Sequence, residues 1–577
     1  MASSARDTLA DVSELVMIIL SFIDIRSLAR SARVCRRWKE IALDLLWREV
    51  DDLHRLMSKL CPFGKPMRKM AGGRTLLSYK YKRRISKQDW ERFSPYANRV
   101  RRLVFDERSA KYRTKVIDNI AFFDISGTKP DRLGGVLPNL QSLVWHVHNP
   151  ESQFKAITFM HHTVREFDVQ IHPTVHAGKD IDFIWQIGSR MPELTHLTLR
   201  LGGPLQQLED HFCRLFERLP KLQKVVLPRC GSTTSVIEGL SRLTYLREIS
   251  LGEPDESGIG DTMNTEHFSP ILHEGAFPSL RCMSFSALLP AAMQFVDSPG
   301  FPANLSRLYV HVTSTVEANI LRGFFSMVAK RCAGLVDLVV DFVICPNIAL
   351  TTPAPPIETR PSISTFRPLF SCRHIASFEF RWDYPLCLQD CDMEEFASAW
   401  PRLEYLMLNA EAVIESTPST LTLGALVPFA SRCARLRHLG IYINADAAPS
   451  YMIDAPFNAL QNLSVGASNI TAADPVALFL SQLCSPYCEI MSGFRWPDAY
   501  GIALDNAGIL DERRTKICEF CVRWNEVMKV LPVVIRARME ERDRVAFRTV
   551  QHEAGSPRQM TPVIWEATIN GSPQEGT

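Results

Sequence analysis

The segment MPELTHLTL, residues 191–199, decides the fold of this chain. Leu194, Leu197 and Leu199 follow a pattern of one apolar residue, two variable residues, a second apolar residue, one variable residue and a third apolar residue. Alternation of this kind is typical of a short strand with one face toward a core. The pattern recurs in thirteen rows, whose first apolar residues are Val100, Leu140, Val164, Leu194, Leu222, Leu246, Leu280, Leu305, Leu335, Ile375, Leu403, Leu436 and Leu460. The repetition predicts a solenoid, because no single unit can bury its own apolar face.

Helical segments lie between the rows. Residues 212–219 carry apolar side chains at helical spacing before the row at Leu222, and similar stripes precede the rows at Leu335 and Leu403. A Pro or Cys often stands shortly before a row, as in LPKL and CARL, where it ends the helix. We therefore expect an α/β fold in which residues 90–490 form a curved parallel sheet with helices on its outer side.

The N-terminal stretch ELVMIILSFIDIRSLARSARVCRRWKEIALDLLW, residues 14–47, predicts a module of three helices. Its first helix is apolar on two faces, one formed by Leu15, Ile18, Ile19 and Phe22 and the other by Val16, Leu20 and Ile23. A helix that is apolar nearly all round needs cover on more than one side. A module of this size cannot supply that cover alone, so we expect one face to dock on a separate protein.

The module resembles the F-box, a small domain that attaches a protein to the Skp-type adaptor of a cullin ubiquitin ligase. The similarity lies in VCRRW at residues 34–38, in IA at Ile41 and in LW at Leu46. The chain departs from the family at the start of the domain, where Asp11 and Val12 stand in place of the usual leucine and proline. The resemblance implies an F-box over residues 11–50. It also implies adaptor contacts from Glu14, Leu15, Ile19, Leu20, Val34, Trp38 and Trp47, the two tryptophans being partly structural.

The rows resemble leucine-rich repeats, and the whole chain is similar to the F-box/leucine-rich-repeat proteins common in fungi. In most rows the asparagine or cysteine that usually follows the strand is absent, so we expect irregular turns and variable curvature. The resemblance implies a non-catalytic substrate receptor of a cullin-RING ligase: the F-box binds the adaptor and through it the cullin, and the solenoid holds a protein target. Arg200 and Arg381, just past their rows, are candidate contacts for an acidic or phosphorylated target.

Two other classes of function stay open. One is a ligase-independent interaction scaffold, which the missing leucine–proline pair at Asp11 and Val12 favours. The other is an enzyme, but the only CxxC pair, Cys518 and Cys521, stands alone in an amphipathic pattern, and the sequence has no phosphate-binding glycine loop or nucleophile elbow. We therefore expect neither a metal nor another cofactor.

Composition bounds the partners and the compartment. A formal net charge of +3 over 577 residues gives no general attraction to nucleic acid or to a membrane. No apolar stretch approaches the roughly 18 residues that a membrane span needs. The N-terminus, MASSARDTLADVSE, lacks a signal-peptide core, so we expect the cytoplasm and/or the nucleus, where the fifteen cysteines stay free thiols.

The remaining segments complete the predicted domain plan. Residues 1–10 and 551–577 are expected to be disordered, and residues 351–364, TTPAPPIETRPSIS, to form an extended loop. Residues 51–89 form a basic linker, in which KYKRR at residues 80–84 is alternatively a nuclear import signal or part of a phosphate-binding patch. Residues 491–550 form a helical cap whose Trp524, Met528 and Leu531 close the core of the last repeat.

Overall fold

The computed structural model describes the chain from residue 13 to residue 554 with internal gaps. The described residues are 13–71, 74–109, 115–172, 177–201, 205, 208–252, 263–314, 317–342, 355–382, 384–412, 419–447, 455–493 and 511–554. The N-terminal segment 1–10, residues Asp11 and Val12, and the tail from residue 555 lie outside them, so the predictions made for these residues stay predictions.

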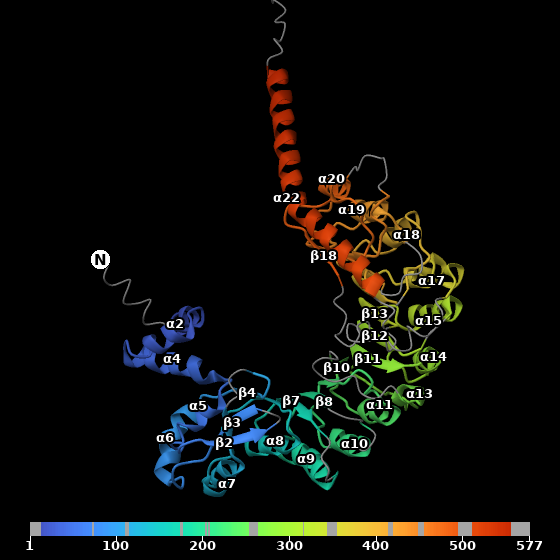
Figure 1. Cartoon of the computed structure of the whole chain (residues 1–577). Coiled ribbons are helices and arrows are strands. Elements are labelled where there is room, and N and C mark those ends of the chain that lie inside the picture. Colours follow the sequence, from blue (N-terminus) through green and yellow to red (C-terminus); the bar gives the residue numbers. More distant parts are fainter. Residues whose placement is uncertain are drawn as a thin grey trace, which may run out of the picture.

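One parallel sheet of 15 strands runs through the molecule, and its spatial order follows the sequence. The strands are β1 (Glu49–Val50), β4 (Arg102–Asp106), β6 (Ser142–His146), β7 (Glu166–Ile171), β8 (His196–Leu201), β9 (Lys224–Leu227), β10 (Glu248–Leu251), β11 (Cys282–Ala287), β12 (Arg307–Val312), β13 (Asp337–Asp341), β14 (Ser377–Arg381), β15 (Tyr405–Leu408), β16 (His438–Ile441), β17 (Asn462–Gly466) and β18 (Glu489–Ser492). The thirteen predicted rows are the strands from β4 to β17, and β1 and β18 extend the sheet at its two ends. Figure 1 shows that the sheet is curved and that helices cover its outer side.

The helices between the strands complete each repeat. They are α7 (Asn119–Thr128), α8 (Pro150–Gln153), η1 (Phe154–Phe159), α9 (Ala177–Arg190), α10 (Glu209–Glu217), α11 (Thr234–Ser241), α13 (Met263–Glu266), α14 (Leu289–Asp297), α15 (Ala318–Arg331), η2 (Ile357–Thr359), α17 (Ile363–Phe366), η3 (Arg367–Ser371), α18 (Asp392–Ala399), η4 (Leu423–Leu426), α19 (Val427–Arg432) and α20 (Ala473–Leu483). The three apolar positions of every row are buried, except that Phe105 and Leu251 are only partly buried. They form one continuous core between sheet and helices, as the repeat pattern predicts.

Residues 51–89 are folded, although the sequence suggested a linker. They contain α5 (Leu53–Met57) and the antiparallel strands β2 (Met67–Ala71) and β3 (Arg74–Tyr79), which join β5 (Lys115–Ile117) in a second, three-stranded sheet. Helix α6 (Lys87–Ala97) starts at a capping box between Ser86 and Asp89. Within KYKRR, Tyr81 is buried and the Arg83 guanidinium lies 2.5 Å and 2.8 Å from the Asp89 carboxylate. This segment therefore belongs to the fold, and the side chains of Lys82, Arg83 and Arg84 stay exposed on its surface.

The predicted extended loop at residues 351–364 is also partly folded. Its described portion, from residue 355, contains η2 and the start of α17. Arg360 is buried, its Nε donates a hydrogen bond to the carbonyl of Pro355 at 3.0 Å, and its guanidinium lies 5.7 Å from the ring centre of Tyr384. These contacts fix the segment against the solenoid.

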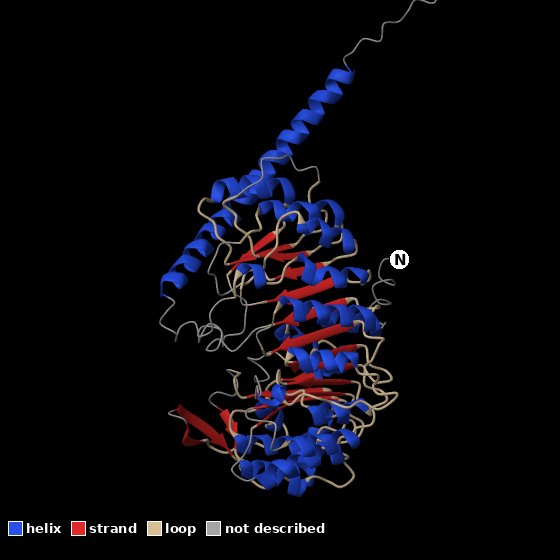
Figure 2. Cartoon of the chain, turned by 90° about the vertical axis from the view of Figure 1, so that its right-hand side faces the viewer, coloured by secondary structure: helices blue, strands red, loops and turns tan. Residues whose placement is uncertain are grey.

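A long helix, α22 (Asp511–Ala554), closes the C-terminal end of the solenoid. Trp524 and Leu531 are buried and Met528 packs beside them, as predicted, and the Trp524 indole N–H donates to the carbonyl of Ser468 at 2.9 Å. Val527 and Ile535 are buried as well and Arg538 donates to the carbonyl of Leu478, and only beyond these contacts does the helix project away from the repeats, as Figure 2 shows. Among the described helices, none is both long enough and apolar enough to cross a membrane.

The N-terminal module contains three helices, α2 (Ser13–Ser21), α3 (Ile25–Ser31) and α4 (Arg36–Arg48). Its α4 leads directly into β1, which pairs in parallel with β4. The Arg99 guanidinium binds Asp44 at 2.6 Å and also pairs with Glu40, both on α4. These contacts hold the module at the N-terminal end of the solenoid, with α22 capping the opposite end (Figure 1).

Candidate functional site

The N-terminal module has a very small core of its own. Helices α2, α3 and α4 meet around four buried residues, which are Val16, Leu20, Leu28 and Ala42. Asp24 begins α3 by accepting hydrogen bonds from the backbone N–H groups of Arg26 and Ser27 at 2.9 Å and 3.1 Å. The hydrogen bond from the Ser27 side chain, and then that from its backbone, lower the Asp24 pKa. The cap fixes the turn between the first two helices.

Large apolar side chains remain exposed around that turn. Phe22 is 84% exposed, Ile25 68% and Ile19 58%, and further exposed apolar residues are Leu15, Met17, Ile18 and Val34. A group of exposed apolar residues of this size on one small module marks a protein-binding surface. We call these seven residues the apolar face of the module.

The residues predicted to contact an adaptor divide into two groups. Glu14, Leu15, Ile19 and Val34 are exposed and could be reached by a partner. By contrast, Leu20 is 1% exposed and belongs to the core of the module, and Trp38 packs partly against that core.

Trp47 is also structural. It is 5% exposed and belongs to the core of the solenoid, where its ring lies 5.1 Å from that of Tyr96. Sequence reasoning omitted Met17 and Ile25 from the exposed face. The signal for Ile25 is its place directly after the Asp24 cap, because the first turn of a helix has few neighbours on its open side.

The inner face of the solenoid carries the residues that alternate with the buried rows. Strand register places them side by side, so that charged residues of neighbouring strands meet. Lys224 pairs with Glu248 at 2.8 Å and Arg307 with Asp337 at 2.5 Å. Over much of this face, opposite charges therefore neutralise each other.

The two arginines proposed as target contacts are part of this pairing. Arg200 donates from Nε to Oδ1 of Asp168 at 2.8 Å and from a terminal nitrogen to Oδ2 at 3.0 Å. Burial raises the pKa of Asp168, but hydrogen bonds from His146 and Arg200 outweigh it and lower the pKa overall. Arg381 lies 2.5 Å from the carboxylate of Glu379. Both guanidinium groups thus already have carboxylate partners within the chain.

A closed polar cluster lies on strands β11 to β13. The fully buried Asp341 carboxylate accepts a hydrogen bond from the Tyr309 hydroxyl at 2.6 Å and pairs with Nδ1 of His311. Burial would raise the pKa of Asp341, but His311, and then Arg229 and Arg381, hold it well below its usual range.

Ser286, His311 and Asp341 stand on adjacent strands in register, an order that invites comparison with a hydrolase triad. The Ser286 hydroxyl, however, is buried and donates to the carbonyl of Arg229. The cluster therefore stabilises the inner face and offers no accessible nucleophile. Among the described residues, no group of three His, Cys, Asp or Glu side chains could hold a metal ion.

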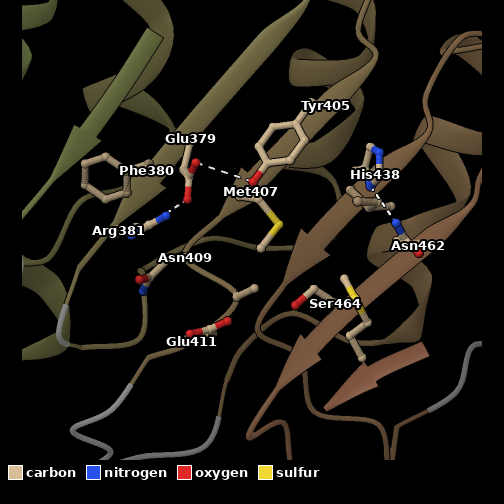
Figure 3. A pocket seen from close by; sticks show the side chains of 13 residues that line it. Glu379, Phe380, Arg381, Tyr405, Met407, Asn409, Glu411, His438, Asn462 and Ser464 are labelled. Atoms are coloured by element: carbon tan, nitrogen blue, oxygen red, sulfur yellow. Dashed lines mark hydrogen bonds and ion pairs between the residues drawn. The ribbon is translucent and has the colours of Figure 1, made fainter. Parts of the chain in front are cut away.

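A cavity of about 320 Å³ opens on the inner face at strands β14 to β18, and Figure 3 shows its lining. Side chains of four successive strands line it, namely Tyr405, Met407, His438, Asn462, Ser464 and Met491, and so do the charged residues Glu379, Arg381 and Glu411. The Tyr405 hydroxyl donates to Glu379 at 3.4 Å, and His438 and Asn462 are joined by a hydrogen bond of 2.8 Å. The ion pair of Glu379 and Arg381 thus continues the charge pairing of the inner face into this cavity, where aromatic, thioether and amide groups stand beside it.

Gly440 makes room for this cavity. A Cβ atom at residue 440 would lie 2.1 Å from Sδ of Met407, so any larger residue would displace the Met407 side chain. Sequence reasoning could not find the cavity, because its residues are the variable positions of each row. Their grouping becomes visible only once the strand register is known.

Comparison with known proteins identifies the N-terminal module. Residues 13–52 match the family model described as F-box-like. No curated protein matches the chain. Among solved structures, a TLR13–ssRNA13 complex matches with 14% identity and a TM-score of 0.30, covering 65% of this chain and 58% of that chain.

Two further matches have a similar extent. A leucine-rich-repeat protein, LegL7 from Legionella pneumophila, matches with 10% identity and a TM-score of 0.29, covering 61% of this chain and 88% of that chain. The LRIM1/APL1C complex matches with 12% identity and a TM-score of 0.27, covering 80% of this chain and 72% of that chain.

The fold and its two surfaces define a protein-interaction adaptor. An exposed apolar module stands at one end, and a curved sheet of repeated strand–helix units presents a long inner face. More particularly, the chain combines an F-box-like domain at residues 13–52 with a leucine-rich-repeat solenoid. The family assignment of the module rests on the matched residues, and that of the solenoid rests on its own strand order and buried rows.

Proposed function

We propose that this protein is the substrate-recognition subunit of a cullin-RING ubiquitin ligase in the cytoplasm and/or the nucleus. The observation that carries the proposal is the apolar face of an F-box-like module, with Phe22, Ile25 and Ile19 exposed. Burying such side chains on a partner removes apolar area from water, at about 25 cal/mol per Å². A Skp-type adaptor is the partner proposed for this face, and the cullin is recruited through it.

The solenoid supplies the target-binding surface in this proposal. Its cavity at β14–β18 accepts an apolar or aromatic side chain of the target against Met407 and Met491, beside the ion pair of Glu379 and Arg381. The receptor itself carries out no chemistry. It raises the effective concentration of the target's lysines near a ubiquitin-loaded enzyme, and this proximity alone accelerates transfer.

The rigid connection between module and solenoid supports this role. Because α4 continues into β1 and Arg99 binds Asp44 and Glu40, a target on the solenoid keeps a defined position relative to a bound adaptor. Substitutions test the proposal better than removal of the module would. Deletion through residue 50 would also remove Trp47 and β1, which belong to the first layer of the solenoid.

The test is adaptor binding by the full chain and by the double variant Leu15→Asp with Ile19→Asp. Two carboxylates on the apolar face should weaken adaptor binding at least 100-fold in a titration with purified Skp-type adaptor, because each would be buried without a partner. The matched control is Val522→Asp with Val533→Asp, which alters two exposed valines on α22 and should leave the affinity unchanged. Undiminished binding by the first variant would refute the assignment of this face.

Co-purification from cells separates the ligase role from a ligase-independent scaffold. With proteasome and deneddylation inhibitors present, the full chain should recover both adaptor and cullin, and the Leu15→Asp, Ile19→Asp variant neither. Proteins recovered with both forms are the candidate targets. Recovery of the adaptor without any cullin would identify the scaffold instead.

A further inference from the structure

A regular ladder of backbone hydrogen bonds runs along the edge of the sheet where the strands begin. The N–H of Val336 donates to the carbonyl of Ser306, that of Ala376 to Val336, that of Glu404 to Ala376 and that of Arg437 to Glu404, at 2.8 to 2.9 Å. Residues in equivalent places of successive repeats therefore stand side by side, at the strand spacing of about 4.8 Å. We call this line the entry edge of the solenoid.

Basic side chains gather on the entry edge between β14 and β16. His374, Arg402 and Arg435 stand two residues before the ladder residues Ala376, Glu404 and Arg437, respectively. Arg437 is thus itself part of the ladder. All four are exposed. His374, Arg402 and Arg435 line an open cavity of about 470 Å³ together with Glu404 and Val336.

Within the part of the chain that the structure describes, these arginines have no carboxylate counterion. Among the described residues, no carboxylate forms an ion pair with Arg402, Arg435 or Arg437. Glu404 lines the same cavity, so that two guanidinium groups, those of Arg402 and Arg435, stand with one carboxylate there. Like charges at neighbouring positions of a sheet repel each other and lower stability.

The same edge is compensated in the N-terminal half of the solenoid. There the ladder runs through Arg165, Thr195 and Gln223. Glu193, which occupies the place equivalent to Arg402, binds Arg165 at 3.0 Å and Lys221 at 2.7 Å. The N-terminal half thus has the carboxylate of Glu193 between two cations, whereas the C-terminal half has the guanidinium of Arg402 in the equivalent place. The positive field of the C-terminal half therefore attracts an external anion.

We propose that the entry edge at Arg402, Arg435 and Arg437 binds an acidic segment, rich in Asp and Glu, of the target protein. This inference rests on the proposed function, because it assigns the acidic segment to the target protein of the receptor. The cations are spread over successive repeats, which suits several carboxylates along an extended chain. Glu404 within the group opposes the concentrated charge of a phosphate, and the exposed Val336 offers an apolar contact beside the acids.

The experiment measures binding of three labelled twelve-residue peptides to the full chain by fluorescence anisotropy at 150 mM salt. The first alternates Asp and Glu with Gly, the second replaces each acid by its amide, and the third is the amide peptide with one phosphoserine. We expect the acidic peptide to bind, and to bind at least tenfold more tightly than either of the others. Preference for the phosphoserine peptide, or equal binding of the acidic and amide peptides, would overturn the proposal.

Two variants locate the site. Arg402→Ser with Arg435→Ser should weaken binding of the acidic peptide at least tenfold, while leaving the circular dichroism spectrum unchanged because both residues are exposed. The control, Arg214→Ser with Arg322→Ser, removes the same charge from exposed positions on α10 and α15 and should change affinity less than twofold. Equal losses in both variants would indicate a general charge effect and refute the site.

The adaptor-face variant separates this inference from the proposed function. Leu15→Asp with Ile19→Asp should bind the acidic peptide as the unmodified chain does, although it loses the adaptor. Conversely, the Arg402→Ser, Arg435→Ser variant should keep full adaptor affinity. Loss of peptide binding in the adaptor-face variant would contradict an independent site at the entry edge.

Discussion

The N-terminal module and the solenoid use their apolar residues in opposite ways. The solenoid buries almost every apolar row position in one core that runs from Trp47 to Ile535. The module has only four buried residues in its own core and leaves Phe22, Ile25 and Val34 in water. A helical domain of that size cannot complete its own core, whereas stacked repeats complete one another.

The difference separates residues that maintain the fold from residues that are kept for a partner. In the solenoid, substitution of a buried residue should cost stability and leave adaptor binding intact. In the module, substitution of an exposed apolar residue should cost binding and leave stability intact. Each of the following predictions tests one side of this comparison.

The largest loss of stability is expected for Trp524→Ala in the C-terminal cap. The Trp524 side chain is fully buried and its indole donates to Ser468, so removing it leaves a cavity and an unsatisfied carbonyl. A substitution of this kind costs about 3 to 5 kcal/mol. Because repeats contact only their neighbours, the loss should be local, and hydrogen exchange should quicken in β17 and β18 before β6.

The control for this prediction lies on the same helix. Val522 is largely exposed, so Val522→Ala should change the free energy of unfolding by less than about 0.5 kcal/mol. Faster exchange throughout the sheet in the Trp524 variant, or none at all, would contradict the description of α22 as a cap on the last repeat.

A smaller effect is expected from acidification, through His161 in the solenoid. Burial lowers the pKa of His161 to about 4, and a Cβ at Gly135 would lie only 2.5 Å from its ring. The unfolded chain takes up a proton below about pH 6.5, whereas the folded chain does so only near pH 4, so folding is favoured at neutral pH. That stability should be lost progressively as the pH falls from about 6.5 to about 4, by about 2 to 3 kcal/mol.

Urea denaturation of the full chain at pH 7.0 and pH 4.5 measures this effect. His161→Gln should lose less stability between the two pH values than the unmodified chain. His162 is exposed, so His162→Gln should keep the original pH dependence. Equal pH dependence in both variants would show that protonation of His161 does not limit the stability of the solenoid.

The repeated rows allowed the solenoid to be predicted from the sequence, because burial imposes the same three apolar positions on every strand. The strands at the two ends of the sheet, β1 and β18, were not predicted because they lack these three apolar positions. Glu49–Val50 is too short to show a period, and Glu489–Ser492 contains only one buried residue, Ile490. The folded segment at residues 51–89 was hidden by its basic composition, although the buried Leu53, Leu56 and Met57 lie at helical spacing within it.

The binding surfaces were less predictable than the fold. The apolar face of the module followed from its sequence, since Leu15 and Ile19 repeat at helical spacing. Arg200 and Arg381 were chosen by position alone, and the structure gives each a carboxylate partner from the same or a neighbouring strand. Which cations remain uncompensated depends on strand register, and a sequence without that register does not reveal it.

The smallest change in stability is expected for Phe22→Ser, on the module's side of the comparison. Phe22 is 84% exposed, so the substitution removes little from the folded chain and should alter the free energy of unfolding by less than about 0.5 kcal/mol. Adaptor affinity should nevertheless fall at least tenfold, because the buried aromatic area would be lost from the complex.

Leu20→Ser, in the same segment of the module, should have the opposite effects on stability and on adaptor binding. It places a hydroxyl in the core of the module, where Leu20 is 1% exposed, and should cost about 2 to 5 kcal/mol. Calorimetric titration with the adaptor and thermal melting of the same two variants compare the effects directly. If Phe22→Ser lowered the melting temperature as much as Leu20→Ser, the exposed face would be part of the fold and not a surface kept for a partner.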